Sequence, residues 1–331
     1  MNIEFENKLN VIDMHCDTIT RQEVVEQGLR KADLHINLEK MMEGEYLMQC
    51  FATFIFLMDK RDTPFNLANG YMDILDSELE KNKDIISQIT TLTQLADNVE
   101  KKKMSALYTI EEGGVLEGKM ENLHHFYNRG VRMMTLTWNF PNEIGFPNFK
   151  LERGKEPDMT IPNDKDGLTP FGIEVVKEMN RLGMIVDVSH LSDAGFLDVV
   201  KYSDKPFVAS HSNSRSVCNC VRNLTDDMIK ALDEKGGVMG INFCADFISN
   251  STENQIPDII RHIKHIKEVG SINCIALGSD FDGIDTPKGM SDCTKMHLLK
   301  KALEEDGFTD EEIHKIFYKN FLRVFKEVCN Y

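Results

Sequence analysis

The feature that most constrains the fold is a series of eight short apolar runs separated by segments with helical spacing. Most runs are continuous rather than alternating, which is typical of parallel strands covered on both faces. They span residues 11–16, 47–56, 105–110, 131–137, 184–189, 206–210, 237–243 and 274–279. Strands that alternate with helices predict βαβ units and a parallel sheet. Eight such units favour an α/β fold, a closed (β/α)₈ TIM barrel of the metal-dependent hydrolase type, formed by residues 1–331 as a single domain. An open doubly wound sheet is the alternative.

The segments between the runs carry start and stop signals for helices. Segments 169–183, 192–203, 225–236 and 257–270 begin near a Ser, Thr, Asp or Pro, and most end at Gly. These residues cap helix N-termini and terminate C-termini, respectively. Near the end of the chain, 309–328 has the pattern of an amphipathic helix, which we expect to pack on the barrel wall.

Two segments exceed what a minimal barrel needs. Residues 57–104 predict a helical insertion after the second strand, and residues 138–168 form a long loop after the fourth strand, rich in Pro, Gly and Asn. Because a loop of this length is often functional, we expect it to cover the active site.

Charge and cysteine content narrow the class of protein. The chain has 54 acidic and 38 basic residues, a formal charge of −16, which disfavours nucleic acid and anionic membranes as partners. The first residues have neither the basic nor the apolar part of a signal peptide, and no apolar stretch is long enough for a membrane span. We therefore expect a cytoplasmic protein whose eight scattered cysteines are reduced thiols.

Histidines and carboxylates follow five of the apolar runs. In a barrel, the C-terminal ends of the strands meet at one rim, where active sites form. Imidazole and carboxylate groups that converge there are the ligands preferred by zinc and similar divalent metals. The candidates are His15 and Asp17, Glu111 and Glu112, His190, His211, and Asp280 and Asp282.

Most of these residues have a simpler alternative role. A single histidine at a strand end is usually structural, but three at one rim together with carboxylates favour a metal site. His262 and His265 fit the half-exposed face of a helix.

The choice among neighbouring acids is less direct. Glu111 fits a solvated acid in a turn, whereas Glu112, directly before two glycines, is the sharper candidate for a carboxylate that bridges two cations. Of Asp280 and Asp282, one is expected to be a ligand.

Other catalytic motifs are missing. The sequence contains no G-x-S-x-G, no G-x-x-x-x-G-K-[ST] and no G-x-G-x-x-G after a strand, so serine hydrolase, P-loop and dinucleotide-binding functions have no support.

Several motifs together resemble the membrane (renal) dipeptidase family, peptidase family M19, in the amidohydrolase superfamily. They are "DMHCDT", "EEGG", "GLTPFGIEVVKEMNRLGMIVDVSH", "VASHSNSRSVCNCVRNLTDD", "ALGSDFDGI" and "KNFLRVFKEV", spread from residue 11 to about residue 328. The resemblance implies a (β/α)₈ barrel and a zinc-dependent dipeptidase with two Zn²⁺ per subunit, bridged by a glutamate. The substrate would be a dipeptide, cleaved by a water or hydroxide between the metals.

The same resemblance assigns roles to individual residues. One zinc would take His15, Asp17, Glu112 and Asp280, and the other would take Glu112, His190 and His211. Asp280 and Glu112 would be catalytic, with Asp280 moving the proton. Arg222 would bind the substrate's carboxylate, as an arginine fork suits two oxygens. Trp138, expected in the substrate site, stands where mammalian members have a histidine that stabilises the transition state.

This departure keeps other functions open. The alternatives are another amidohydrolase reaction, such as cyclic amide hydrolysis or deamination, and a metal-binding scaffold with impaired catalysis. The number of subunits is also open, with a homodimer as one alternative.

Overall fold

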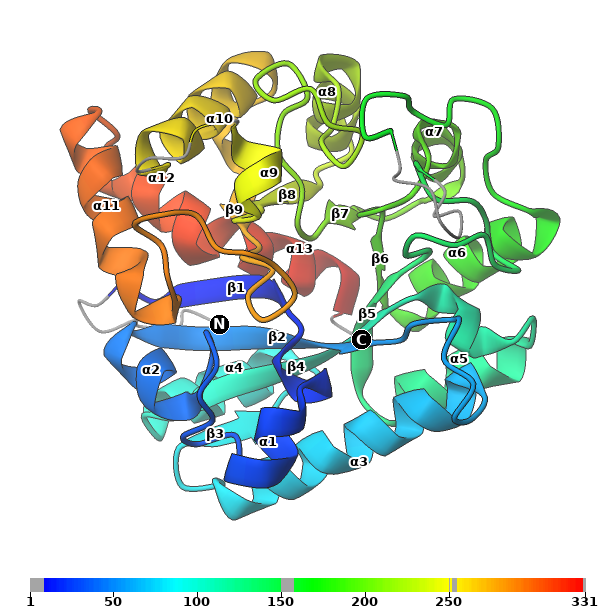
Figure 1. Ribbon diagram of the computed structural model, residues 1–331, viewed down its shortest axis with the longest axis horizontal. Helices are drawn as coiled ribbons and strands as arrows, with labels where there is room; N and C mark the ends of the chain where they lie inside the picture. Colours follow the sequence, from blue (N-terminus) through cyan, green and yellow to red (C-terminus); the bar gives the residue numbers. More distant parts are fainter. Residues whose placement is uncertain (1–8, 150–157, 250, 252–254, 330–331) are drawn as a thin grey trace.

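The eight apolar runs form a closed barrel of parallel strands in the computed structural model, which describes residues 9–149, 158–249, 251 and 255–329. The strands are β1 (Val11–Cys16), β2 (Tyr46–Phe54), β4 (Met104–Glu111), β5 (Val131–Thr135), β6 (Ile185–Asp187), β7 (Val208–Ala209), β8 (Val238–Ile241) and β9 (Ile275–Leu277). Each pairs in parallel with the next, and β1 pairs with both β2 and β9, which closes the ring (Figure 1). The TIM barrel prediction is confirmed, and the open doubly wound sheet is excluded.

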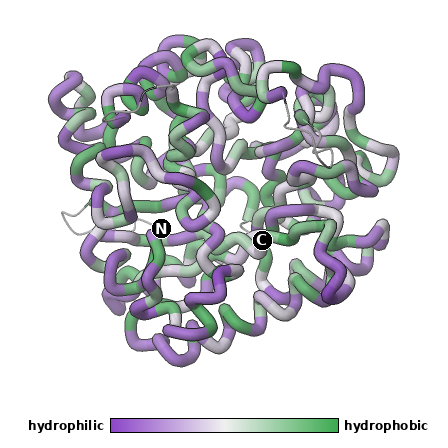
Figure 2. The backbone as a smooth tube through the Cα atoms, in the orientation of Figure 1, coloured by the Kyte–Doolittle hydropathy of each residue, from purple (hydrophilic) through white to green (hydrophobic). Residues whose placement is uncertain are grey.

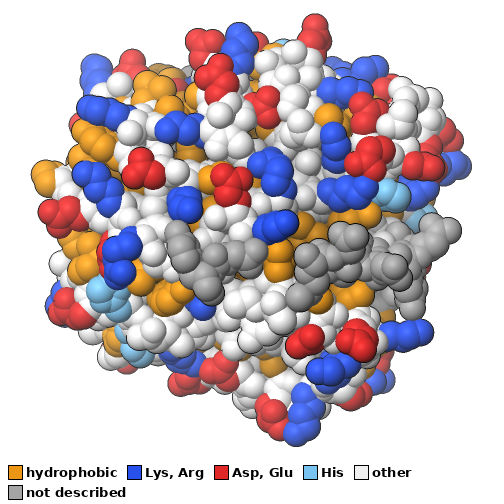
Figure 3. Space-filling model, turned by 180° about the vertical axis from the view of Figure 1, so that it is seen from behind, with side chains coloured by type: hydrophobic (Ala, Val, Ile, Leu, Met, Phe, Trp, Pro, Cys, Tyr) orange, Lys and Arg blue, Asp and Glu red, His pale blue; other side chains and the backbone are white. Residues whose placement is uncertain are grey.

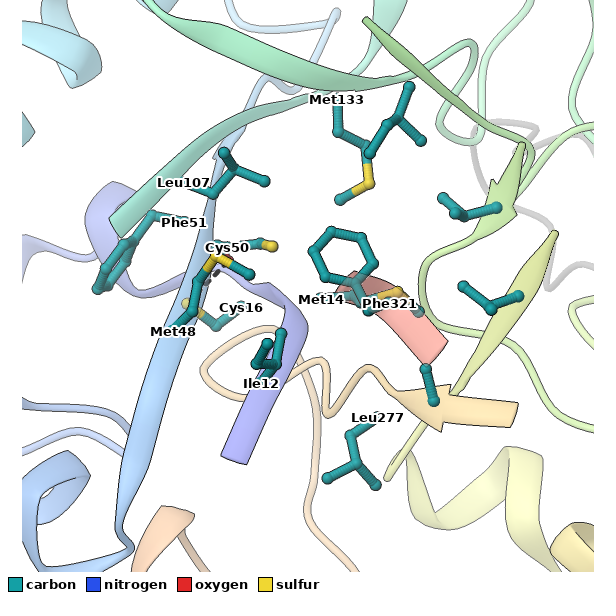
Figure 4. Close-up of a cluster of buried hydrophobic side chains, with 14 of the residues drawn as sticks. Ile12, Met14, Cys16, Met48, Cys50, Phe51, Leu107, Met133, Leu277 and Phe321 are labelled. Carbon is teal, nitrogen blue, oxygen red and sulfur yellow. Dashed lines mark hydrogen bonds between the residues drawn. The ribbon is translucent and has the colours of Figure 1, made fainter. Parts of the chain in front are cut away.

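The strands are buried along almost their whole length. All described residues of β1, β4 and β8 are buried, as the continuous apolar runs predict. Side chains from several strands meet in one cluster that includes Met14, Leu107, Met133 and Leu277 (Figure 4). Hydrophilic segments lie mostly at the periphery (Figure 2).

The four predicted helices occur, and three of them begin at a predicted side-chain cap. Thr169, Ser192 and Thr225 accept a backbone N–H with their side chains at the starts of α6 (Pro170–Leu182), α7 (Asp193–Tyr202) and α8 (Asp226–Glu234). Other helices around the barrel are α1 (Gln22–Gln27), α2 (Leu38–Glu43), α5 (Met120–Asn128), α10 (Ile256–Val269) and α11 (Met296–Glu305). Shorter elements are α9 (Ala245–Ile248), η1 (Thr18–Thr20), η2 (Gly113–Leu116), η3 (Ile272–Cys274) and η4 (Cys293–Lys295).

The insertion after the second barrel strand is helical, with one addition. It contains α3 (Pro64–Lys81), α4 (Leu92–Glu100) and, between them, β3 (Ile86–Gln88), which pairs with the first residues of β4. The sequence did not predict β3 because its three residues, Ile-Ser-Gln, form no apolar run.

The C-terminal helix closes the lower end of the barrel rather than packing on its wall. It comprises α12 (Asp310–His314), the π-helical turn η5 (Lys315–Lys319) and α13 (Asn320–Cys329). Asn320 Nδ2 donates to the carbonyl of Ile272 in η3 and to that of Ile275 at the start of β9, 2.7 and 2.8 Å away. Cys329 Sγ lies 4.0 Å from the carbonyl of Arg132 on β5, four strands away from β9 in the ring of eight. The helix therefore spans the barrel floor, and the wall prediction is wrong.

Among the described residues of the long loop after β5, the first ones reach the site. Trp138 and Asn139 line the pocket described below, and Pro147 forms a bridge to Leu191. Residues 150–157 of the predicted covering loop lie outside the described residues.

The cysteines, the surface charges and the helix lengths bear on the predictions made from composition. All eight cysteines are unpaired, as predicted, and all lie in the described part of the chain. Acidic and basic side chains are interspersed on the face in Figure 3. Within the described residues, no helix has the length and apolar character needed to span a bilayer. A cytoplasmic location and a homodimer stay predictions.

The floor helix yields a stability prediction. Phe321, at the start of α13, is 1% exposed and reaches the interior cluster (Figure 4). Phe321→Ala should lower the free energy of unfolding by about 3–5 kcal/mol, because it removes a buried ring and leaves a cavity. Denaturant unfolding measures this loss, and Leu197→Ala, at a 60% exposed position, is the control expected to change little. A Phe321→Ala protein as stable as the wild type would show that α13 does not stabilise the barrel by closing its floor.

Candidate metal centre and substrate pocket

The backbone turns sharply where the strands end, and these turns direct polar side chains to the barrel mouth. His190 after β6 and Asp280 after β9 have positive φ angles of 67° and 64°, which are uncommon for residues with a side chain. Gly283 allows a close approach, since a Cβ there would lie 1.9 Å from Asp17 Oδ2. Such strained positions often mark functional sites.

Glu111, the last residue of β4, lies at the centre of the polar cluster. Its Oε2 is 3.3 Å from His15 Nε2. Its Oε1 is 3.0 Å from His190 Nε2 and 3.5 Å from His211 Nε2. The two oxygens of one buried carboxylate therefore face two different groups of residues.

Two aspartates complete the group around His15. Asp280 Oδ1 and Asp17 Oδ1 lie 3.8 and 3.9 Å from His15 Nε2. His15, Asp17 and Asp280 offer ligand atoms within 4.8 Å of one another, and so do His15, Glu111 and His211.

Glu112 faces away from the histidines, so the prediction that it joins them is wrong. Its carboxylate accepts hydrogen bonds from the backbone N–H of Gly114 (2.7 Å) and Trp138 (3.0 Å) and from Asn142 Nδ2 (2.5 Å). The reason is strand alternation: successive side chains point to opposite faces. Leu107 belongs to the interior cluster, so Glu111, four residues later, faces inward and Glu112 does not.

The glycines after Glu112 serve packing rather than a ligand. A Cβ on Gly113 would lie 2.6 Å from the carbonyl oxygen of Leu136. The missing side chain thus lets the turn after β4 pack against the segment that follows β5.

The positions of Asp280 and Asp282 show which of the two is the ligand candidate. Asp282 accepts hydrogen bonds from Thr18 Oγ1 (2.6 Å) and from the backbone N–H of His35 (2.6 Å). It ties two loops together, whereas Asp280 faces His15.

The buried carboxylates hold a positive charge on His15. Burial alone would lower the pKa of His15, but Glu111, Asp17 and Asp280 raise this pKa to about 10. Burial would raise the pKa of Glu111, yet His15 and its other imidazole partners hold that pKa well below its usual value. Burial raises the pKa of Asp280 to about 6. The cluster therefore keeps a cation among its carboxylates.

The other two histidines are neutral. Burial, with a smaller effect from the charge of Arg222, lowers the pKa of His190 to about 3. Burial and the charge of His15 hold the pKa of His211 well below its usual value. A neutral imidazole has one N–H and one nitrogen with a free lone pair, so the position of the proton decides which nitrogen can bind a metal.

Hydrogen bonds fix the proton on Nδ1 in both neutral rings. His190 Nδ1 donates to Asn139 Oδ1 at 2.8 Å. His211 Nδ1 donates to Ser210 Oγ at 2.8 Å, because that hydroxyl itself donates to Asp187 Oδ2 at 2.5 Å. The Nε2 atoms of His190 and His211, 3.0 Å apart, therefore direct lone pairs toward each other and toward Glu111 Oε1.

This arrangement fits a bound metal. Lone pairs that face one another in a buried site repel unless a cation lies among them. Both ring nitrogens of His15 and Oδ1 of Asp17 are also buried without a hydrogen-bond partner. Nitrogen and carboxylate oxygen donors of this kind suit zinc.

A pocket of about 440 Å³ opens above the cluster. Its walls include the cluster residues Asp17, Glu111, His190 and Asp280, the rings of Phe54, Trp138 and Phe247, and the charged groups of Arg21, Asp246 and Asp285. The volume is within the range of small-molecule sites.

Arg222 is buried and does not itself line this pocket, but it lies against Phe247, which does. Its Nη2 donates to the carbonyl of His211 at 3.4 Å, its guanidinium lies 5.7 Å from the centre of the Phe247 ring, and its Nε has no hydrogen-bond partner. A buried arginine with an unused donor is suited to an anionic group of a ligand.

Two histidines that the sequence placed on a half-exposed helix face differ from each other. His265 is partly exposed and lies 2.8 Å from Asp226. His262 is fully buried, accepts the backbone N–H of Ser214 and lies 2.9 Å from the carbonyl of Ile248, so that prediction is wrong for His262. His262 is a structural residue that links α10 to α9 and to the segment around Ser214.

No sequence motif singles out the residues that hold the ligands in place. Ser210 and Asp187 orient His211, Asn139 orients His190, and Asn242 Nδ2 donates to Asp280 Oδ2 at 2.9 Å. The aspartate in "VDVSH" and the serine in "ASHS" lie close to ligand candidates in the sequence. Asn139 and Asn242 lie in loops with no pattern that marks them.

Comparison with known proteins identifies the family. The model of the membrane dipeptidase family, peptidase family M19, matches residues 3–331. The chain belongs to this family. It is therefore a metallo-peptidase that hydrolyses dipeptides, which confirms the resemblance seen in its motifs and disfavours a scaffold, a deaminase or a cyclic amide hydrolase.

Individual relatives support this membership. An uncharacterized protein in the pqqA 5′ region of Klebsiella pneumoniae is 32% identical over 268 residues, 78% of this chain and 97% of that protein. An uncharacterized dipeptidase of Schizosaccharomyces pombe is 31% identical over 341 residues, 99% of this chain and 77% of that protein.

Solved structures share the fold. The crystal structure of dipeptidase AC, a metallo-peptidase of family M19, is 25% identical with a TM-score of 0.87, covering 98% of this chain and 100% of that one. A metallo-peptidase from Rhodobacter sphaeroides, solved with a phosphinate mimic of L-Ala-D-Ala, is 24% identical with a TM-score of 0.86, covering 97% and 100%.

Ser210 should be needed for metal affinity. Ser210→Ala removes the hydroxyl that fixes the proton on His211 Nδ1, so zinc affinity should fall about 10- to 100-fold with the fold retained. Zinc titration against a competing chelator measures the change. Ser203→Ala removes a hydroxyl that bonds Asn180 and the Lys205 carbonyl away from the site, and should keep wild-type affinity. Equal affinity in the two variants would contradict the role of Ser210.

Zinc binding should release protons. At pH 8, below its pKa of about 10, His15 carries a proton in the metal-free protein, and it must lose this proton to bind a metal. Zinc affinity should therefore fall as the pH is lowered. Calorimetric titration in two buffers of different ionisation enthalpy should show release of at least one proton per protein. Heats that do not depend on the buffer would exclude a protonated His15, and His265→Asn, at the surface, should leave the release unchanged.

Proposed function

We propose that the protein hydrolyses dipeptides with two zinc ions held on the two sides of Glu111. The observation that carries this proposal is the set of unprotonated Nε2 atoms of His190 and His211 that face Glu111 Oε1, while Glu111 Oε2 faces His15. One carboxylate between two donor groups is the arrangement that a bridging ligand requires.

The donors divide into two sets. His15, Asp17, Glu111 and Asp280 would hold one ion, and Glu111, His190 and His211 would hold the other. When bound, the two ions supply a water nucleophile of lowered pKa and polarise the scissile carbonyl.

Asp280 is suited to move the proton. Its carboxylate lines the pocket, and Asn242 Nδ2 donates to Oδ2, which fixes its orientation. Asp280 would accept a proton from the attacking water and deliver it to the leaving amine, as general acid–base catalysis requires.

Arg222 would bind the carboxylate of the substrate. Its charge is buried and its Nε has no partner, so an incoming carboxylate would supply the missing acceptor. A group that holds the free carboxylate one residue from the scissile bond favours dipeptides over longer peptides.

Substitution of the two neighbouring glutamates tests the proposal. Glu111→Gln removes a charge that both donor sets share, so metal-loaded protein should lose bound zinc and at least 10³-fold in kcat/KM on a dipeptide panel. Glu112→Gln, the matched control one residue away, should retain its zinc because Glu112 faces the Gly114 and Trp138 amides. Zinc content is read by elemental analysis and activity by release of free amino acids.

Two outcomes would contradict the proposal. Zinc that stays in Glu111→Gln but leaves in Glu112→Gln would reverse the assignment of the bridge. Zinc-loaded wild-type protein that hydrolyses no dipeptide, including those with a D-residue at the C-terminal position, would reject the dipeptidase function.

A further inference from the structure

We propose that this enzyme selects dipeptides whose amino-terminal residue is large and apolar, through an aromatic wall formed by Phe54 and Trp138. This inference rests on the proposed function, because it takes Arg222 as the group that holds the substrate's carboxylate.

The aromatic wall is a continuous apolar part of the pocket. Phe54 ends β2 and Trp138 follows β5, and both rings line the pocket. Their centres are 4.9 Å apart, in an edge-to-face arrangement at 68°. Such a pair offers a substrate side chain a broad apolar surface and favourable ring contacts.

Two further rings pack against the Trp138 ring. Phe56 and Phe140 lie 5.9 and 5.8 Å from the Trp138 ring, and neither lines the pocket itself. Phe56 also packs against Phe140 at 5.6 Å. The wall is therefore part of a four-ring cluster rather than a single mobile side chain.

Glu112 holds the backbone of Trp138 in place. The Trp138 N–H donates to Glu112 Oε2, and Asn142, later in the same loop, donates to Oε1. Glu112 has a φ of 107°, a strained conformation that these hydrogen bonds maintain. Glu112 is thus a positioning residue for the wall.

Barrel topology decides which residue of the dipeptide meets the wall. Arg222 follows β7, and Phe54 ends β2, which lies four strands away from β7 in the ring of eight. Glu111 is the strand partner of Phe54, and its carboxylate faces His211, whose backbone carbonyl accepts a hydrogen bond from Arg222. A dipeptide with its carboxylate at Arg222 and its peptide carbonyl above Glu111 therefore extends its amino-terminal residue toward Phe54 and Trp138.

The other walls do not offer the same surface to that residue. Phe247 lies against Arg222, at the carboxylate end of the bound substrate. Arg21, Asp246 and Asp285 line further parts of the pocket with charge. A large apolar side chain at the amino-terminal position gains most by covering the aromatic wall, since burial of apolar area from water is favourable.

Two series of dipeptides test the proposal with zinc-loaded wild-type enzyme. The first varies the amino-terminal residue (Gly-Ala, Ala-Ala, Leu-Ala, Phe-Ala), and the second varies the carboxy-terminal residue (Ala-Gly, Ala-Leu, Ala-Phe). The kcat/KM for Phe-Ala should exceed that for Gly-Ala at least 10-fold, mainly through KM, and the second series should show a smaller spread.

The wall variants localise the preference. Trp138→Ala and Phe54→Ala should each reduce the Phe-Ala to Gly-Ala ratio at least threefold, and Trp138→Phe should restore most of it. Leu197→Ala, an exposed apolar residue on α7, should keep the wild-type ratio. Because the ratio compares two substrates on the same enzyme sample, partial misfolding of a variant does not change it.

The possible outcomes separate this inference from the proposed function. Failure of the wild type to hydrolyse any of these dipeptides would reject the dipeptidase function. Hydrolysis with equal kcat/KM for Phe-Ala and Gly-Ala, a preference confined to the second series, or an unchanged ratio in both wall variants would overturn the aromatic wall alone.

Discussion

Three lone pairs that face one another across about 3 Å dominate the chemistry of this barrel mouth. Two belong to His190 and His211 and the third to Glu111, and no proton of either ring lies among them. On the other side, Glu111 together with Asp17 and Asp280 surrounds His15 and raises its pKa. Buried charges and lone pairs of one sign are tolerated only with compensating positive charge. The whole site is therefore built for cations.

The barrel makes this cluster possible. Parallel strands end at a common rim, so residues as far apart in sequence as His15 and Asp280 meet there. Left-handed turns at His190 and Asp280 direct the side chains inward, and α13 closes the opposite end with apolar side chains. The floor is thus apolar, whereas the ionisable side chains of the site gather at the mouth.

Much of the fold could be predicted from the sequence because its signals are local. Eight apolar runs and the caps at Thr169, Ser192 and Thr225 define strands and helices without knowledge of the partner segments. The course of α13 depends on which surface is left uncovered once the barrel closes. An amphipathic pattern shows that one face is buried, and it does not show against what.

The site was less completely predictable. Histidines and aspartates at strand ends could be found because parallel strands bring their ends together. The choice between Glu111 and Glu112 needed the alternation of β4, counted from the inward-facing Leu107, rather than the adjacent glycines. Asn139 and Asn242 act through loop conformations that no sequence pattern specifies.

The Glu111-centred cation site is tested most directly by a crystal structure of the zinc-soaked protein with anomalous diffraction at the zinc edge. We expect two anomalous peaks, one among His15, Asp17 and Asp280 and one beside His190 and His211, with the Glu111 carboxylate between them. Peaks at Glu112, or no peak at the barrel mouth under saturating zinc, would contradict a Glu111-centred site.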